Sequence, residues 1–143
     1  MKKRNINIVV NLDDVLQCVY AESSRRGLAA PEVYVLTEDN ARLLVQYIET
    51  GLKDVRTRMA GYVNLCSFNP NVDERNIVLQ LMLEHPASAS IDDVMSNTLV
   101  QLLANYALLR FYGERDTYYG VAWRKYRAQL LLVLARDQAA IAQ

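Results

Sequence analysis

The side chains best suited to chemistry in this sequence are one histidine and two cysteines. His85 is the only histidine, so no second imidazole is present to complete a His-Glu-x-x-His zinc motif. A general base would also need a nucleophile or an orienting acid, and the sequence marks neither. Cys18 and Cys66 lie in apolar segments outside any Cys-x-x-Cys pair. We therefore predict a solvent-exposed histidine at a strand end and two buried, reduced thiols.

Three pairs of adjacent acidic residues are the remaining candidates for acid–base or metal chemistry. Each pair stands in the first turn of a predicted helix, where the helix dipole and the free backbone amides favour negative charge. Helix capping therefore accounts for these positions without a carboxylate site. The pairs are Asp13/Asp14, Glu38/Asp39 and Asp92/Asp93.

No catalytic motif identifies a reaction. The five glycines form neither a G-x-G-x-x-G nor a Walker pattern, and no serine has a G-x-S-x-G context. The sequence accordingly predicts a protein that is not an enzyme, with no catalytic residues, no metal site and no cofactor. The alternative is an enzyme with an unrecognised pocket, which would show a deep cleft with convergent polar side chains.

The composition is that of one globular chain. Its 143 residues suit a single domain over residues 1–143, and 52% hydrophobic with 22% charged residues can build a core. Lys+Arg and Asp+Glu are both 16, so the net charge is zero. Domains that grip phosphates usually carry a basic excess. We therefore do not expect nucleic-acid binding to be the main activity.

Neither a signal peptide nor a membrane span is predicted. The apolar run near the N-terminus, Ile6–Val10, is too short for a signal-peptide core. The longest uncharged run, Val94–Leu109, is interrupted by five polar side chains, which excludes a membrane helix. We expect a cytosolic protein, or one that is assembled into a structure made in the cytosol.

Capping residues place the first two predicted helices. Asn11 caps a helix over Leu12–Arg26, and Gly27 is predicted to end it in a left-handed conformation. Thr37 caps an amphipathic helix that ends near Gly61.

The segment 61–84 has a different character and predicts a β-ribbon. Two β-prone runs, YVNLCSF and NIVLQLMLE, flank the turn-rich sequence NPNVDER. Apolar residues alternate along the second run with period two, which is typical of a strand. A helix over 73–85 is the alternative, since leucine also favours helix. A further short strand is predicted over Asn5–Val10.

Two more helices complete the predicted fold. Ser90 opens a helix over Ile91–Tyr112 that is too apolar for a single buried face, so it lies at the centre of the fold or between subunits. Gly113 closes it, and a last helix follows over about 116–140. The predicted fold is mainly α, a bundle of about four helices with a small β-ribbon or hairpin inserted at about 61–84 and a short N-terminal strand.

The stretch Leu108–Arg127 carries half of the aromatic residues and several basic ones. On two helices that meet at Gly113, its aromatic side chains gather on one side of the last helix. Core packing, a protein interface, and a nucleic-acid or ligand platform are the three interpretations. Helical spacing and zero net charge favour the first two. The candidate interface residues are Arg110, Tyr112, Tyr119, Trp123, Arg124, Tyr126 and Arg127.

The order of the elements resembles a known family. A capped helix, LTEDNARLLVQYIETGLKDVRTRMAGYV, precedes a hairpin segment, and an apolar helix ending in LVQLLANYALLRFYGERD follows it. This pattern, over roughly Thr37–Asp116, resembles the small helical head–tail connector (head-completion) proteins of tailed phages and prophages. The N-terminal strand and the long last helix are more elaborate than in the shortest connectors.

The resemblance implies a structural role. Copies of the chain would form a homo-oligomeric ring that joins portal and capsid to the tail, with DNA passing through without sequence-specific contact. The implied partners are other copies and portal or tail proteins, with no membrane and no small molecule. The implied location is the virion, or otherwise the bacterial cytoplasm. The alternative function is a cytosolic helical adaptor or regulator that binds one protein partner.

Overall fold

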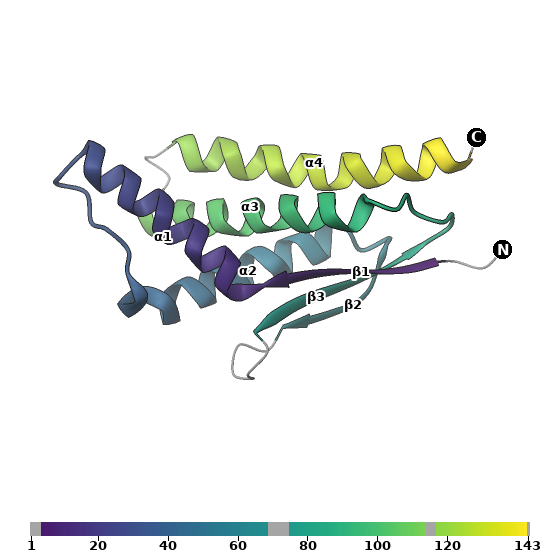
Figure 1. The fold of residues 1–143 in the computed structure, drawn as a ribbon, viewed down its shortest axis with the longest axis horizontal. Helices are drawn as coiled ribbons and strands as arrows, with labels where there is room; N and C mark the ends of the chain where they lie inside the picture. The colour runs from purple at the N-terminus through teal and green to yellow at the C-terminus, as the bar shows by residue number, and fades with distance from the viewer. Residues whose placement is uncertain (1–3, 69–74, 114–116, 143) are drawn as a thin grey trace.

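The first strand of the protein continues without a loop into its first helix (Figure 1). A computed structural model describes residues 4–68, 75–113 and 117–142. Within these residues the fold is the predicted one, mainly α with a small antiparallel sheet. In chain order the elements are β1 (Arg4–Asn11), α1 (Leu12–Ala29), the 3₁₀ turn η1 (Glu38–Asn40), α2 (Ala41–Arg58), β2 (Val63–Phe68), β3 (Asn76–Leu83), α3 (Ile91–Tyr112) and α4 (Thr117–Ala142).

The sheet has the strand order β1-β3-β2, and both pairings are antiparallel. β2 and β3 form the predicted hairpin, and β3 buries alternate residues, so the helical alternative for this segment is wrong within the described residues. β1 pairs with the other edge of β3, from Arg4 opposite Leu83 to Asn11 opposite Asn76. The predicted turn over 69–74 lies outside the described residues. The N-terminal strand is therefore part of the same sheet as the ribbon.

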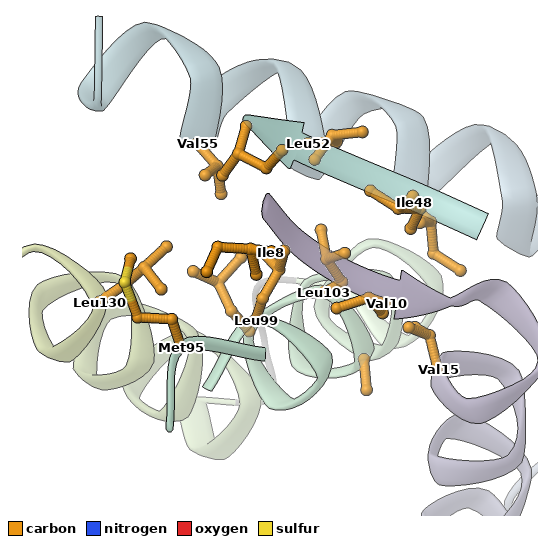
Figure 2. Close-up of a cluster of buried hydrophobic side chains, with 14 of the residues drawn as sticks. Ile8, Val10, Val15, Ile48, Leu52, Val55, Met95, Leu99, Leu103 and Leu130 are labelled. Carbon is orange, nitrogen blue, oxygen red and sulfur yellow. The ribbon is translucent and has the colours of Figure 1, made fainter. Parts of the chain in front are cut away.

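The core lies between the sheet and the helices. Figure 1 shows α3 between α4 and the strands, with α1 crossing at one end. Figure 2 shows Ile8 of β1 beside Leu99 of α3, with Leu52 of α2 on the opposite side of the cluster. Leu130 brings α4 into the same group. Buried side chains from all four described helices and from the sheet thus share one core.

Helix α3 is central to the fold. Seven consecutive residues, 102–108, are buried, as are Ile91, Met95 and Leu99. Such burial on every side needs neighbours all around the helix, and α1, α2, α4 and β1 supply them. The apolar excess of α3 is thus buried within one chain, which answers the question that its sequence raised.

Most of the predicted helix ends are confirmed. The Asn11 side chain accepts a hydrogen bond from the Asp13 amide, and Thr37 forms a capping box with Asn40. Gly113 ends α3 with φ of +87°, a conformation that glycine adopts without strain.

One predicted helix end is wrong, and one predicted cap lacks its side-chain hydrogen bond. Helix α1 continues through Gly27 to Ala29, and Gly27 instead allows a close contact with the connector that follows. A methyl group at Gly27 would lie 2.3 Å from Val35 Cγ2, so the glycine makes room for the connector that folds back onto α1. The Ser90 side chain makes no capping hydrogen bond, and Asp92 instead accepts from the Asp93 amide at 3.0 Å.

The far end of α4 holds the linker between β3 and α3. The Gln138 side chain accepts from the His85 amide at 3.0 Å and donates to the His85 carbonyl at 3.1 Å. Asp137 accepts hydrogen bonds from the amide and hydroxyl of Ser88. The last part of α4 therefore contacts the linker that precedes α3.

Candidate interaction surface on helix α4

The aromatic corner predicted as an interface turns largely into the protein. Tyr119 is only 1% exposed, and its ring stacks on Tyr112 with the centroids 5.9 Å apart. The Arg26 guanidinium of α1 lies 4.4 Å from the centroid of the Tyr112 ring. Cation–π contact and aromatic stacking thus join α1, α3 and α4. Tyr119 is a core residue.

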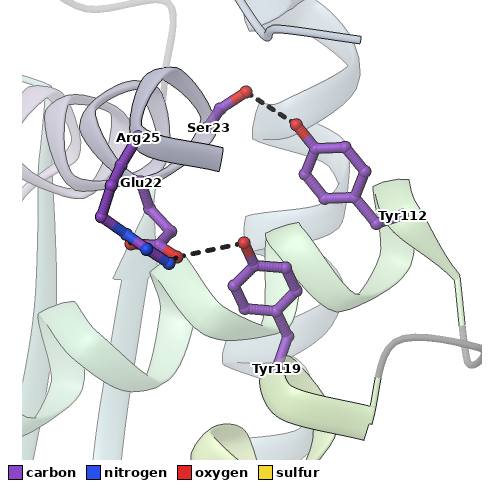
Figure 3. A network of polar contacts seen from close by, with 5 residues as sticks. All are labelled: Glu22, Ser23, Arg25, Tyr112 and Tyr119. Atoms are coloured by element: carbon purple, nitrogen blue, oxygen red, sulfur yellow. Dashed lines mark hydrogen bonds and ion pairs between the residues drawn. The ribbon is translucent and has the colours of Figure 1, made fainter. Parts of the chain in front are cut away.

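A relay of hydrogen bonds fastens the connector between α1 and α2 to this corner, and Figure 3 shows its central link between Ser23 and Tyr112. The Leu36 amide donates to Ser23 Oγ at 2.7 Å, and the Tyr112 hydroxyl donates to the Tyr34 carbonyl at 2.7 Å. Tyr112 has one proton to give, so the 2.7 Å contact between the two hydroxyls requires Ser23 to donate to Tyr112. Every hydroxyl in the relay is used.

A second polar contact in Figure 3 joins α4 to α1. The Tyr119 hydroxyl donates to Glu22 at 3.2 Å, and Glu22 also accepts from Arg25 Nε at 3.0 Å. The hydrogen bond from Arg25 lowers the pKa of the Glu22 carboxyl, against the opposing effect of burial. Burial raises the pKa of Tyr119. Glu22 is therefore the charged acceptor of this pair at neutral pH.

Trp123 forms a third group, between α3, α4 and α2. Its ring lies 5.3 Å from the Tyr106 ring, and the Arg127 guanidinium lies 4.3 Å from its centroid. Arg127 is also 3.5 Å from Asp54 Oδ2 of α2. Among the described residues the buried Trp123 indole N–H has no hydrogen-bond partner. Trp123 and Arg127 thus mainly contact other residues of the same chain.

The other three predicted interface residues lie nearer to solvent. Arg124 is exposed, and Tyr126 is half-buried against the core. Arg110 is exposed, and its guanidinium lies 5.7 Å from the Tyr47 ring of α2. Whether any of the seven contacts a partner stays a prediction, and for most of them the structure supplies an intramolecular contact.

Helix α4 has a second apolar face, on the side away from the core. Its members follow each other at alternating spacings of three and four residues, and every one is exposed. Tyr118 is 65% exposed, Val121 56% and Leu132 47%. A solvent-facing helix surface is normally polar. The outer α4 row, as we name it, consists of Tyr118, Val121, Lys125, Ala128, Leu132, Ala135 and Ala139.

The exposed charges that α4 itself carries beside or within this row are positive over its described residues. Arg124, Lys125 and Arg136 are exposed, and none forms an ion pair with a described acidic residue. The acidic residue within the α4 sequence, Asp137, is half-buried and bound to Ser88. The outer face of α4 is therefore apolar and cationic, although the whole chain is neutral.

A groove of about 370 Å³ adjoins the first turn of the row, between α1, α3 and α4. Tyr118 and Arg25 stand among its lining residues, with Asn105 and Ala104 from α3. The Asn105 amide donates to the Gln101 carbonyl at 2.8 Å. Glu22 also lines the groove and accepts a hydrogen bond from Tyr119, so contacts within the protein already occupy both Asn105 and Glu22. The groove widens the apolar surface beside α4.

Of the residues first considered for chemistry, Cys18 lines the groove beside the row, and His85 contacts Gln138 of α4. His85 follows β3, as predicted, but it is half-buried because Gln138 holds its backbone. Cys18 and Cys66 are free and half-buried rather than buried, and burial raises the pKa of each thiol. No three His, Cys, Asp or Glu side chains in the described part of the chain gather closely enough to hold a metal ion.

The acidic pairs occupy the first turns of α1, η1 and α3, as capping predicts. Across residues 4–68, 75–113 and 117–142, none of the helices has the length and hydropathy needed to cross a membrane.

Comparisons add no family to this description. The sequence matches no protein-family model, and neither a curated protein nor a solved structure shows significant similarity to it.

The outer α4 row was missed in the sequence because the inward aromatic residues dominate the same helix. Most of its members lie one or two positions before a residue that faces the core, so apolar residues occur on more than one side of α4. In the helix over 91–112, apolar residues on more than one side predicted burial on several sides. The same reasoning applied to the last helix would have indicated a second contact face.

Proposed function

We propose that this protein is a structural subunit of a larger assembly, of the head–tail connector type that its sequence resembles. In this role, copies form a ring that joins portal and capsid to tail, and DNA passes through the ring without sequence-specific contact. The outer α4 row carries the proposal, because an apolar row of this length on a solvent-facing helix is typical of a surface that another protein covers.

A second exposed apolar surface supports a ring subunit over a single-partner adaptor. Leu28 is 87% exposed at the end of α1, and Tyr34, in the connector that follows, is 58% exposed. The end of α1 and the connector after it lie at one end of the molecule, whereas α4 runs from that end toward the other (Figure 1). A ring subunit needs surface for its neighbouring copies and a separate surface for the portal or tail protein that the ring joins. An adaptor needs only one.

The zero net charge also fits a subunit past which DNA moves. A strongly basic lumen would hold phosphates and slow the passage of DNA, since each neutralised phosphate adds binding free energy.

The proposal is tested by placing a charge in each surface. Leu132→Asp in the outer α4 row and Leu28→Asp at the end of α1 both change exposed side chains, so each variant is expected to fold. Gln46→Asp is the control, because Gln46 is exposed on α2 and belongs to neither surface. The measurement is the joining of tails to filled heads by each variant, scored by electron microscopy, with circular dichroism to verify folding.

We expect both Leu variants to lose joining and the control to keep it. Loss with Leu132→Asp alone would favour the adaptor, which uses one surface. Full joining by both variants would contradict the assembly role. Portal and tail genes beside the coding gene would support the connector independently.

A further inference from the structure

We propose that the outer α4 row binds an acidic amphipathic helix of a partner protein. The inference rests on the assembly role proposed above and names the class of partner that covers α4. Three properties of the row carry it: its spacing, the sizes of its side chains and the sign of the charges beside it.

The spacing selects a helix lying along α4. Positions 118, 121, 125, 128, 132, 135 and 139 alternate steps of three and four, the heptad period of a coiled-coil seam. A row with this period drifts by only about 20° per heptad around a straight helix, and a slight left-handed supercoil keeps it facing a partner helix. At about 1.5 Å per residue the seam is about 32 Å long. A partner helix of three heptads matches that length.

The side-chain sizes allow close approach. Ala128, Ala135 and Ala139 leave shallow positions, and Tyr118, Val121 and Leu132 project between them. Large side chains of one helix fit the holes that small ones leave in the other. Lys125 interrupts the seam, and its long stem can cover apolar surface while the ammonium stays in water.

The charges decide between a second copy and another protein. Arg124, Lys125 and Arg136 are exposed beside or within the row, and Asp137 is held by Ser88. Two copies of α4 packed together would bring like charges into proximity, which disfavours the pair. Carboxylates flanking the seam of a partner helix would instead meet three cations.

A lipid surface suits the row less well. Helices that lie in a membrane interface present a broad apolar face with several large side chains. The row offers three large apolar side chains and three alanines, and the opposite face of α4 is buried in the core. A narrow seam of mixed side-chain size therefore favours a helix.

Two designed peptides test the proposal. Both are helices of about 21 residues with leucine at the seam positions, and one carries Glu where the other carries Lys at the flanking positions. Binding of the full-length protein is measured by fluorescence anisotropy at low and high salt. Vesicles of neutral and anionic phospholipid form a third arm, and analytical ultracentrifugation gives the oligomeric state.

We expect the acidic peptide to bind at least about tenfold more tightly than the basic one, with the difference shrinking at about 1 M salt. Leu132→Glu should abolish binding, and Gln129→Ala should not change it. The triple variant R124E/K125E/R136E should reverse the preference and bind the basic peptide. That reversal also shows that the variant is folded.

Equal affinity for the two peptides, or binding of neither, would overturn the proposal. So would a dimer that Leu132→Glu dissociates, or binding to anionic vesicles in place of the peptide. If neither peptide binds while Leu132→Asp still blocks the joining of heads to tails, the partner class is wrong and the assembly role stands. If the acidic peptide binds while joining is unaffected by that variant, the assembly role fails instead.

Discussion

Single hydroxyl groups hold the connector to the helices in this protein. Ser23 is fully buried and both accepts from Leu36 and donates to Tyr112, which in turn donates to the Tyr34 carbonyl. Each group in such a chain depends on its neighbours, because a lost link leaves a polar atom in an environment with little water.

Tyr112→Phe tests this dependence. The change removes the acceptor of the Ser23 hydroxyl and the donor to the Tyr34 carbonyl, while it keeps the ring on Arg26. We expect the free energy of unfolding to fall by about 1–3 kcal/mol, the cost of unsatisfied buried polar groups. Urea denaturation followed by circular dichroism measures it.

Tyr62→Phe is the matched control, because Tyr62 is half-buried and no described residue forms a hydrogen bond with its hydroxyl. Equal stability of the two variants would mean that the relay contributes nothing.

Local residue patterns predicted many of these details and missed others for a consistent reason. Thr37 and Gly113 follow from rules that concern only neighbouring residues, and both predictions are confirmed. Gly27 has the same sequence signature as a helix stop, yet its role is set by Val35, which the connector brings back in three dimensions. No local rule distinguishes these two uses of glycine.

Between elements, a second glycine sets the distance of α2 from α3. A methyl group at Gly51 would lie 2.9 Å from the Tyr106 ring and 3.3 Å from Leu103. Both neighbours are buried in the middle of α3, where packing leaves little room to move.

Gly51→Ala should therefore destabilise the protein, although alanine favours helix by about 1 kcal/mol over glycine. We expect a net loss of about 1–3 kcal/mol, typical of an overpacked core. Gly120→Ala on α4 is the control, since its methyl group would meet Leu109 at an ordinary 3.6 Å. That variant should be stabilised by about 1 kcal/mol in thermal unfolding. Stabilisation of both variants would contradict the close approach.

Element types were more predictable than element pairings. The alternating burial of β3 and the all-round apolar character of α3 are both written in the sequence, and both are confirmed. The pairing of β1 with β3 could not be predicted from the sequence, because about seventy residues separate the strands and several pairings satisfy the same alternation. The outer α4 row was not predicted, because Tyr119, Trp123 and Tyr126 dominate the pattern of the same helix.

At the scale of the whole molecule, one core joins elements that are distant in sequence. Ile8 of β1 is fully buried and shares a cluster with Leu99 of α3 and Leu130 of α4 (Figure 2). Trp123, the only tryptophan, lies on α4 against α3. Its fluorescence therefore reports unfolding at a place far along the chain from β1.

Ile8→Ala should lower the free energy of unfolding by about 2–5 kcal/mol, the range for large-to-small core changes. If the core is cooperative, Trp123 fluorescence and far-ultraviolet circular dichroism will show the same shifted midpoint in urea. Val9→Ala is the control, because Val9 is 47% exposed on the same strand, and its effect should stay below about 1 kcal/mol. A tryptophan transition that is unaffected by Ile8→Ala would mean that the two regions unfold separately.

The order of strands in the sheet has a consequence for synthesis on the ribosome. Of the three described strands, β1 leaves the exit tunnel before the other two and pairs with β3, which is made last of the three, so Ile6, Ile8 and Val10 emerge long before their partners. Until residue 83 has been translated, β1 carries an apolar face and an unpaired edge, features that favour aggregation in a nascent chain. Aggregation of the nascent chain is therefore most favoured between the synthesis of β1 and that of β3.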